Sequence, residues 1–557
     1  MGKVYLKKYK LRISLIFILL ISIFLCIYAV TNYKGNNTTI QNNKFTIEGN
    51  KFNNDLNNMQ SGQNKPENMP SSNKEQTGGN ESSAAFNGTN KPNENIQSNK
   101  NGSMDETNVN RQPHSNKNKP LGQNRNMKRE NSNNKYASAL TIYSVIFLIL
   151  CIGIYYVFRR KNIKINISDE KIVIFTLLAI GLLLRIAVST LMDGHNDVNL
   201  FKNWAETAAN GPLQFYSNAR SADYPPLYIY VLALIGKIAS ISYFKTYFVL
   251  MLKIPSIIAD VVTAYFIYKL GKKYFSSEIG ILLSAFYIFN PAIFIDSTFW
   301  GQVDSIFTLM IVIAAFLLSE KKIVISSAVF AASILMKPQG IIFLPILFFE
   351  LVRKRDLKIF IKAAVSALFT AVIIILPFSL NGQSPLWIFK LYSNTISEYP
   401  YASVNAFNFF GLIGANYTKN TDILVVFNYH TWGMIFIVVT TLISWAVYIK
   451  NNNRNFVSAI ALLQIAGVFT FSVGMHERYL FPAVALSILA FIYLKDRRFF
   501  ILAIGFSITS YINIYSVLFN LNSSNFKTSL MITSFFNIFL VVSLVKVLFE
   551  SFIRGKS

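Results

Sequence analysis

The sequence predicts an all-α, polytopic integral membrane protein with about 14 transmembrane helices, give or take two. Apolar and aromatic residues make up 52% of the 557 residues and charged residues only 14%, whereas soluble domains carry about 25% charged residues. The apolar residues occur in runs of about 20, the length that crosses the ~30 Å hydrocarbon core of a bilayer. Short basic clusters separate these runs. Together these observations argue against a water-soluble enzyme.

The N-terminal third differs from the rest of the chain. A basic stretch followed by an apolar run, without a small-residue cleavage site, predicts a cytoplasmic N-terminus and membrane anchor over residues 1–30. Residues 31–136 are rich in Asn and poor in apolar residues, which predicts a disordered extracytoplasmic segment. An additional transmembrane helix is expected over 137–160, and a multi-spanning domain over 172–550.

The net charge of +26 indicates membrane topology rather than a nucleic-acid partner. The basic residues fall in clusters between apolar runs, namely Arg159–Lys161, Lys272–Lys273, Lys321–Lys322, Arg353–Arg355 and Arg497–Arg498. Such clusters are typical of cytoplasmic loops, and no basic stripe on a soluble fold accompanies them. The charge pattern therefore predicts a multi-pass protein of the cell membrane.

Placing these clusters inside brings the unusual polar residues to the outer face. They are Asp193, His195, Asp197, Asp223, Asp296, Gln302, Asp304, Lys337, Gln339, His476, Glu477 and Arg478. The apolar segments 323–337 and 341–352 are too short to span comfortably. We expect them to stop part-way and to deliver polar groups to a cavity.

The first outer loop contains two acids with more than one interpretation. Asp197 precedes Phe201 and Trp204, which are spaced to share one face of an interfacial helix. Its carboxylate could stabilise the helix start through the helix dipole, or it could take a proton from a hydroxyl. Asp223 precedes Tyr-Pro-Pro and could either fix the return of the loop or bind substrate.

A further acid lies at hydrocarbon depth. Asp260 falls inside an apolar run, where an ionisable group is costly and suggests a functional site. Pairing with Lys253 is an equally good interpretation.

The segment from Asn290 to Asp304 has the composition of a sugar-binding site. Asp296, Gln302 and Asp304 can hydrogen-bond hydroxyls, and Trp300 can pack on the C–H faces of a sugar ring. Purely structural loops seldom combine so many such residues.

Three cationic or imidazole side chains are expected on the same side, where they oppose the positive-inside tendency. Lys337, His476 and Arg478 would be explained by an anion such as a lipid phosphate. The alternative is a local ion pair between Glu477 and Arg478. No spacing indicates a metal site, and no glycine-rich phosphate loop or nucleophile elbow is present.

These motifs together resemble the bacterial GT-C superfamily of membrane glycosyltransferases. More narrowly, they look like those of proteins similar to the GPI-anchor second mannosyltransferase, and protein O-mannosyltransferases are more distant relatives of the same architecture. The motifs are Gly194-His195 with Asp197, Asp223-Tyr-Pro-Pro, Trp300-Gly-Gln-Val-Asp304, Lys337-Pro-Gln339 and His476-Glu-Arg-Tyr-Leu-Phe-Pro482. The resemblance covers residues 172–550 and leaves out the N-terminal anchor and the Asn-rich segment.

The resemblance implies an inverting transferase that moves a hexose, by family default mannose, from a polyprenyl-phosphate donor to an acceptor hydroxyl on the extracytoplasmic face. Asp197 would be the catalytic base. Lys337, His476 and Arg478 would bind the donor phosphate. The substrate-binding residues would be His195, Trp204, Asp223, Asp296, Trp300, Gln302, Asp304 and Gln339. We expect membrane lipid as the surroundings, no cofactor and no obligate protein partner.

Two other functions remain open from the sequence. A transporter or flippase of a lipid-linked saccharide would need a similar cavity but would leave the donor intact. A non-enzymatic envelope protein could use the Asn-rich segment to contact the cell wall. The sugar, the acceptor (a glycan, lipid or protein), metal dependence and oligomeric state are not specified by these motifs.

Overall fold

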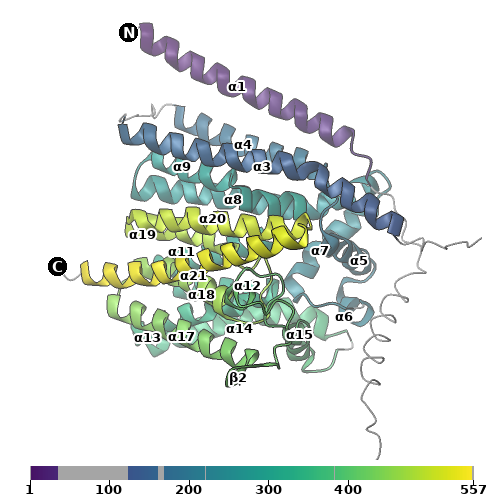
Figure 1. Ribbon diagram of the computed structural model, residues 1–557, viewed down its shortest axis with the longest axis vertical. Helices are drawn as coiled ribbons and strands as arrows, with labels where there is room; N and C mark the ends of the chain where they lie inside the picture. The colour runs from purple at the N-terminus through teal and green to yellow at the C-terminus, as the bar shows by residue number, and fades with distance from the viewer. Residues whose placement is uncertain (1, 36–122, 161–168, 220, 382, 555–557) are drawn as a thin grey trace, which may run out of the picture. The chain divides into compact units, whose positions relative to one another are not determined.

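The computed structural model describes residues 2–35, 123–160, 169–219, 221–381 and 383–554. Long helices lie side by side through most of this part (Figure 1). The N-terminal half contains α1 (Gly2–Thr31), α3 (Gln123–Arg160), α4 (Glu170–Ser189), α5 (Asn196–Asn210), η2 (Pro212–Gln214), α6 (Phe215–Asn218), α7 (Pro226–Ala239), η3 (Lys245–Tyr247), α8 (Phe248–Tyr274), α9 (Ser277–Ile288), α10 (Pro291–Phe294) and the π-helix η4 (Ile295–Trp300). The rest of the Asn-rich segment, residues 36–122, lies outside the described residues.

The C-terminal half continues with further helices and one small hairpin. They are α11 (Asp304–Ser319), α12 (Ile323–Met336), η5 (Pro338–Phe343), α13 (Leu344–Lys354), α14 (Leu357–Ser379), α15 (Trp387–Ser397), α16 (Phe409–Leu412), β1 (Ile423–Leu424), β2 (Phe427–Asn428), α17 (Tyr429–Asn451), η6 (Arg454–Phe456), α18 (Val457–Phe471), α19 (Pro482–Leu494), α20 (Arg497–Leu518) and α21 (Ser523–Arg554). The all-α, polytopic prediction is confirmed at this level.

Nine helices of the described part are long and apolar enough to cross a membrane. A tenth span results if α9 is joined with α10 and η4, a pair bent by 46°. Four shorter apolar helices, α7, α11, α12 and α19, accompany them. The prediction of about 14 spans stays a prediction, because helices of 10–17 residues are too short to cross ~30 Å of hydrocarbon unaided.

The helix expected over 137–160 begins earlier, at Gln123. Its apolar part, Lys135–Gly153, is the candidate span. Once that part is helical, each polar residue added at its N-terminal end gains a backbone hydrogen bond. Residues 123–136 are therefore helical, although they belong to the segment that the sequence predicts to be disordered.

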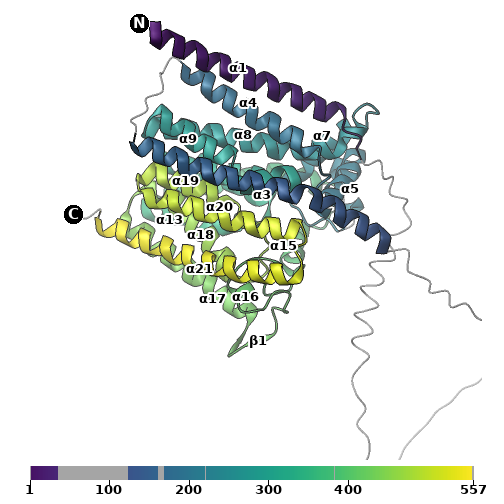
Figure 2. The ribbon, with the colours of Figure 1, turned by 45° about the horizontal axis from the view of Figure 1, so that its top comes forward.

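α1 packs on α4, and α3 contacts the bundle through Tyr143, which reaches Phe289 and Phe294 (Figure 2). On α1, Arg12 pairs with Asp169 at 2.6 Å, just before α4. Just beyond α1, the Tyr33 ring stacks on Tyr247 at 6.3 Å, and its hydroxyl donates to Asp193 at 3.4 Å. On α3, the Tyr143 hydroxyl donates to the Phe289 carbonyl at 2.6 Å.

The centre of the bundle is α18, which is buried on every side from Val457 to Thr470. A helix that is apolar all round belongs in such a position. It packs against α11, α17, α19 and α21, and this arrangement places the turn after α18 beside the starts of α11 and η5.

Charged residues lie at both ends of α8 and α11. At one end lie Lys253 and Asp304, and at the other Lys272 and Lys273 pair with Glu170 and Glu320, each at 2.7 Å. With a rise of 1.5 Å per residue, Lys253 and Lys272 on α8 are about 28 Å apart, close to the hydrocarbon thickness. The paired basic clusters thus lie one membrane thickness from the polar residues described next.

Candidate functional site

Asp197 is at the centre of a cluster formed by residues from distant parts of the chain. Its Oδ2 atom accepts hydrogen bonds from Trp300 Nε1 at 3.1 Å and from Gln302 Nε2. Arg478 Nη2 lies 3.4 Å from the same oxygen. His195 Nδ1 lies 3.3 Å from Oδ1. Oδ2 therefore interacts with side chains from two distant segments, and Oδ1 faces His195 at the start of α5 itself.

The location of Asp197 in that first turn agrees with the helix-dipole interpretation. However, α5 has no side-chain capping hydrogen bond, so capping alone does not account for this carboxylate. Its side chain remains 28% exposed. An anion that is held by donors and still open to solvent can meet a substrate.

The electrostatic surroundings keep Asp197 ionised. Burial alone would raise the pKa of its carboxyl, but Arg478 and the hydrogen bonds from His195 and Trp300 outweigh that effect and lower it well below its ordinary value. With these partners in place, the carboxylate binds a proton only weakly.

The backbone around Trp300 explains how its indole reaches Asp197. The π-helix η4 ends at Gly301, whose φ of 83° is the left-handed conformation that glycine adopts readily. A Cβ atom there would meet Val198 Cγ2 at 2.7 Å. The His195 backbone N–H donates to the Trp300 carbonyl at 3.0 Å, which joins the two segments.

Arg478 links three acids. Its guanidinium binds Glu477, lies 3.4 Å from Asp197 and lies 3.5 Å from Asp304 Oδ2. The guanidinium carbon also lies 4.7 Å from the centre of the Trp300 ring, a cation–π distance. The local Glu477–Arg478 pair exists, but it is one part of a larger network.

Lys337 extends the same network from the end of α12. It forms a buried ion pair with Asp304, and its ammonium lies 5.5 Å from the centre of the Tyr479 ring. Two cations and three carboxylates are thus packed together where α5 and α11 begin, where α12 ends, and where the turn after α18 passes.

His476 differs from the two cations. Burial, together with the charge of Arg478, lowers the pKa of its imidazole to about 3. Its ring lies against Tyr399 at 4.4 Å and Tyr479 at 5.1 Å. At neutral pH this imidazole can offer hydrogen bonds but no positive charge.

Asp223 lies close to Glu398, an acid that the sequence motifs do not single out. Burial raises the pKa of its carboxyl to about 7, and the charge of Glu398 adds to this shift. Thr395 on α15 donates to the Asp223 carbonyl at 2.9 Å, so the end of α15 is held against it. Glu398 directly follows α15. Its position just before Tyr399-Pro400 is the one local sequence feature that could have marked it as a candidate site residue.

The stability of the protein should therefore depend on Asp223 in a pH-dependent way. Its folded pKa of about 7 lies above the ordinary value of 3.8, so between these values the unfolded chain binds fewer protons and stability falls as pH rises. We expect the melting temperature of Asp223→Asn, relative to wild type, to be higher at about pH 8.5 than at about pH 5. A difference that does not change with pH would contradict this, and Asp422→Asn at an exposed site is the matched control.

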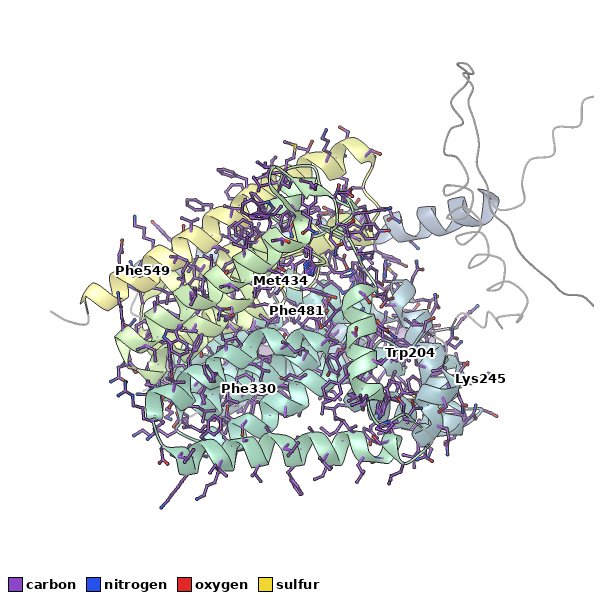
Figure 3. The ribbon with its side chains drawn as sticks, turned by 90° about the horizontal axis from the view of Figure 1, so that it is seen from below. Trp204, Lys245, Phe330, Met434, Phe481 and Phe549 are labelled. Carbon is purple, nitrogen blue, oxygen red and sulfur yellow. The ribbon has the colours of Figure 1, made fainter. Side chains whose placement is uncertain are left out.

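The side chains of three predicted substrate-binding residues make no hydrogen bond or ion pair with this network. Trp204 is 2% exposed and packs on Phe201 at 5.8 Å, within an aromatic cluster (Figure 3). Asp296 is 0% exposed, and neither of its carboxylate oxygens has a hydrogen-bond partner. Gln339 has a buried, unpartnered Oε1. Their roles in binding stay predictions.

A polar stripe on α8, formed by Lys253, Ser256 and Asp260, faces the end of η4 and the turn that follows it. Lys253 Nζ donates to the carbonyls of Met192 at 2.6 Å and Thr298 at 2.7 Å. Ser256 Oγ donates to the Gln302 carbonyl at 2.6 Å. Carbonyls at the end of a helix and in the turn after it have no helical partners, and this α8 polar stripe satisfies two of them, those of Thr298 and Gln302.

The proposed pairing of Asp260 with Lys253 is wrong. Asp260 pairs instead with Arg185 of α4, with Nε and Oδ2 3.1 Å apart and both side chains fully buried. The reason is geometric, because the ammonium of Lys253 already serves backbone carbonyls of two other segments.

Lys253→Met should therefore destabilise the protein. The substitution keeps the apolar stem but leaves buried carbonyls unsatisfied, which costs about 1–3 kcal/mol. We expect a lower melting temperature in detergent and weaker activity. Lys245→Met at an exposed position (Figure 3) should change stability by no more than about 0.5 kcal/mol. Equal behaviour of the two variants would contradict a positioning role for Lys253.

Among the described residues, no group of three or more His, Cys, Asp and Glu side chains is arranged to hold a metal ion. The possible ligands of an anionic substrate are Lys337 and Arg478, whose charges are shared with carboxylates. Metal dependence stays open.

Comparison with known proteins agrees with a membrane glycosyltransferase. Residues 223–380 match the family model of dolichyl-phosphate-mannose-protein mannosyltransferases. No curated protein matches the chain. The matched region includes Asp223, Trp300, Gln302, Asp304 and Lys337, but not Asp197 or Arg478.

With its membrane-spanning helices, this match supports a multi-pass membrane glycosyltransferase of the mannosyltransferase type. It also supports the superfamily that the sequence motifs resemble. The narrower likeness to the GPI-anchor second mannosyltransferase stays a prediction.

Proposed function

We propose that this protein transfers a hexose, most simply mannose, from a polyprenyl-phosphate donor to an acceptor hydroxyl on the extracytoplasmic face of the cell membrane. The observation that carries the proposal is the meeting of a solvent-accessible carboxylate, Asp197, with the guanidinium of Arg478 at 3.4 Å. One group suits a hydroxyl and the other a phosphate. The family match to the adjoining segment supports the reaction type.

In the proposed reaction, the acceptor oxygen attacks the anomeric carbon of the donor sugar from the face opposite the phosphate. The new C–O bond forms as the bond to the phosphate oxygen breaks, and the phosphate leaves with the bonding electrons. Asp197 takes the hydroxyl proton, and the configuration at the anomeric carbon inverts. A lipid phosphate is already a good leaving group, so the chain needs neither a nucleotide nor a covalent nucleophile.

Because Arg478 can bind either Asp197 or the donor phosphate, the proposed reaction has a fixed order, with donor binding before proton removal. While Arg478 is close to Asp197, that carboxylate is a weak base. A donor phosphate would compete for the guanidinium through bidentate hydrogen bonds. Withdrawal of the cation would raise the proton affinity of Asp197. In this proposal the base becomes effective only after the donor is bound.

The geometry also revises how two residues take part. Trp300 is 0% exposed and lies against Arg478 on its ring, so we assign it to orienting Asp197 through its N–H rather than to stacking on a sugar. His476 is kept neutral, and we assign it a hydrogen bond to the donor rather than a charge.

The decisive experiment uses purified protein in lipid vesicles with polyprenyl-phosphate mannose and candidate glycan, lipid or protein acceptors. A transferase releases free polyprenyl phosphate and gives a glycosylated acceptor. A transporter or flippase leaves the donor intact and changes only its leaflet. Impermeant maleimide labelling of Lys245→Cys in intact cells, with both native cysteines replaced, tests whether the site faces outward.

The acceptor can be sought without assuming its class. Mass analysis of lipid-linked sugars and surface glycans, with and without the protein, should reveal an accumulated donor and one missing product. Unchanged profiles of both would contradict the proposal.

A further inference from the structure

The hairpin before α17 carries an unusual apolar tip. Its five consecutive residues, Ile423 to Phe427, are all apolar, and we call this segment the apolar finger. Ile423 is 74% exposed, Val425 87% and Val426 69%. Hairpin tips exposed to water ordinarily carry Asn, Asp and Gly. The side chains of the apolar finger therefore do not suit an aqueous setting.

The backbone conformation of the apolar finger is also unusual for its residue types. Leu424 pairs with Phe427, which makes Val425 and Val426 the two turn residues. Val425 has a φ of 64°, a conformation that is uncommon for any side chain and an outlier for a β-branched one. A glycine or asparagine would relieve this strain, but would also remove the apolar surface of the tip.

The apolar finger is attached to the first turns of a candidate span. Trp432 Nε1 donates to the Leu424 carbonyl at 2.9 Å, and the rings of Phe427 and Trp432 are 5.5 Å apart. Both residues belong to or adjoin α17, whose span begins at Tyr429. Figures 1 and 2 show the hairpin at the edge of the bundle beside α17.

The exposed surface of the apolar finger continues along α17. Farther down that helix, Met434 is 49% and Val438 52% exposed, as expected for side chains facing lipid. Tyr429 and Trp432 at the start of the span are the residue types favoured at the membrane–water interface. With α17 as a span, these residue types would place the finger level with the lipid headgroups.

The loop that bears the finger is also bonded to the candidate site. The Val404 N–H donates to the Met475 carbonyl at 3.0 Å, and the Gly474 N–H donates to the Tyr401 carbonyl at 3.0 Å. Tyr399 packs against His476. The segment from Tyr399 to Asn428 thus connects the finger with the turn that carries Arg478.

We propose that the apolar finger inserts into the lipid surface on the side of the candidate site, with the acyl–headgroup boundary as its partner. Amphipathic segments insert about 5–10 Å at this boundary. The bonded loop then sets the height of the Arg478 turn relative to the headgroups. This inference does not depend on the reaction that the site performs.

The test measures the surroundings of the finger in a bilayer. Val426→Cys, in a protein with Cys26 and Cys151 replaced by Ala, is labelled with an environment-sensitive fluorophore and reconstituted into phosphatidylcholine nanodiscs. The matched control is Lys419→Cys, an exposed position in the same loop. We expect blue-shifted emission and severalfold stronger quenching by lipids brominated near the headgroup for position 426 than for position 419.

Two results would overturn the proposal. Emission typical of water, with strong quenching by aqueous iodide, would place the apolar finger in solvent. Shielding from both iodide and brominated lipid would show that a protein surface covers it. Val426→Leu with the label at Ile423→Cys should preserve the lipid signal, and Val426→Asp with the same label should reduce it, while size-exclusion profiles report whether each variant is folded.

Discussion

Asp197→Asn is expected to lose sugar transfer by about 10²–10⁴-fold, the range typical for removal of a general base. Asparagine keeps the size of the side chain and can still accept from Trp300, so the fold should survive. It cannot take the proton of the acceptor hydroxyl. The measurement is turnover with purified lipid-linked donor, alongside a melting curve in detergent.

The same variant distinguishes catalysis from donor binding. Because Asp197 no longer competes for Arg478, which lies 3.4 Å away in the wild type, donor affinity should be unchanged or improved. Turnover equal to wild type would remove Asp197 from the mechanism. Asp422→Asn, which removes an exposed acid from the loop before α17, should leave turnover unchanged.

Arg478→Lys is expected to reduce turnover by about 10²–10³-fold and to weaken donor binding as well. Lysine keeps the charge but loses the planar fork that binds Asp197, Asp304 and Glu477 together. Arg478→Met should also lower stability, since unpairing a buried charge cluster costs about 3–5 kcal/mol.

Arg355→Lys is the matched control, because this arginine is exposed and lies in the loop after α13. It should retain wild-type turnover and donor affinity. A fully active Arg478→Lys protein would show that positive charge alone suffices, and the bidentate contact with phosphate would be wrong.

Sequence patterns predict which residues lie near the site better than they predict which of those residues contact one another. Asp197, Gln302, Asp304, Lys337 and Arg478 each stand at the end of an apolar run, and ends of neighbouring helices on one side of a membrane must lie near one another. Which atoms meet depends on helix rotation and on bends such as η4, and neither is readable from hydropathy.

The buried charges show the same limit. Lys253 and Asp260 share one face of α8 but lie two turns apart, about 10 Å along the helix axis. Each therefore takes a partner from another segment, since α4 supplies Arg185 and the end of η4 supplies the Thr298 carbonyl. Glu398 likewise follows α15, and the distance of that helix from Asp223 is set by tertiary packing alone. Long-range partners of this kind leave no spacing signal in the sequence.

The contact of Tyr33 with Asp193 and Tyr247 has a practical consequence for anyone preparing this protein. Removing the first 35 residues to improve expression would remove the Tyr33 contacts that support the loop bearing His195 and Asp197. Low activity of a shortened chain could then result from the loss of these contacts, so activity assays should begin with the full-length chain.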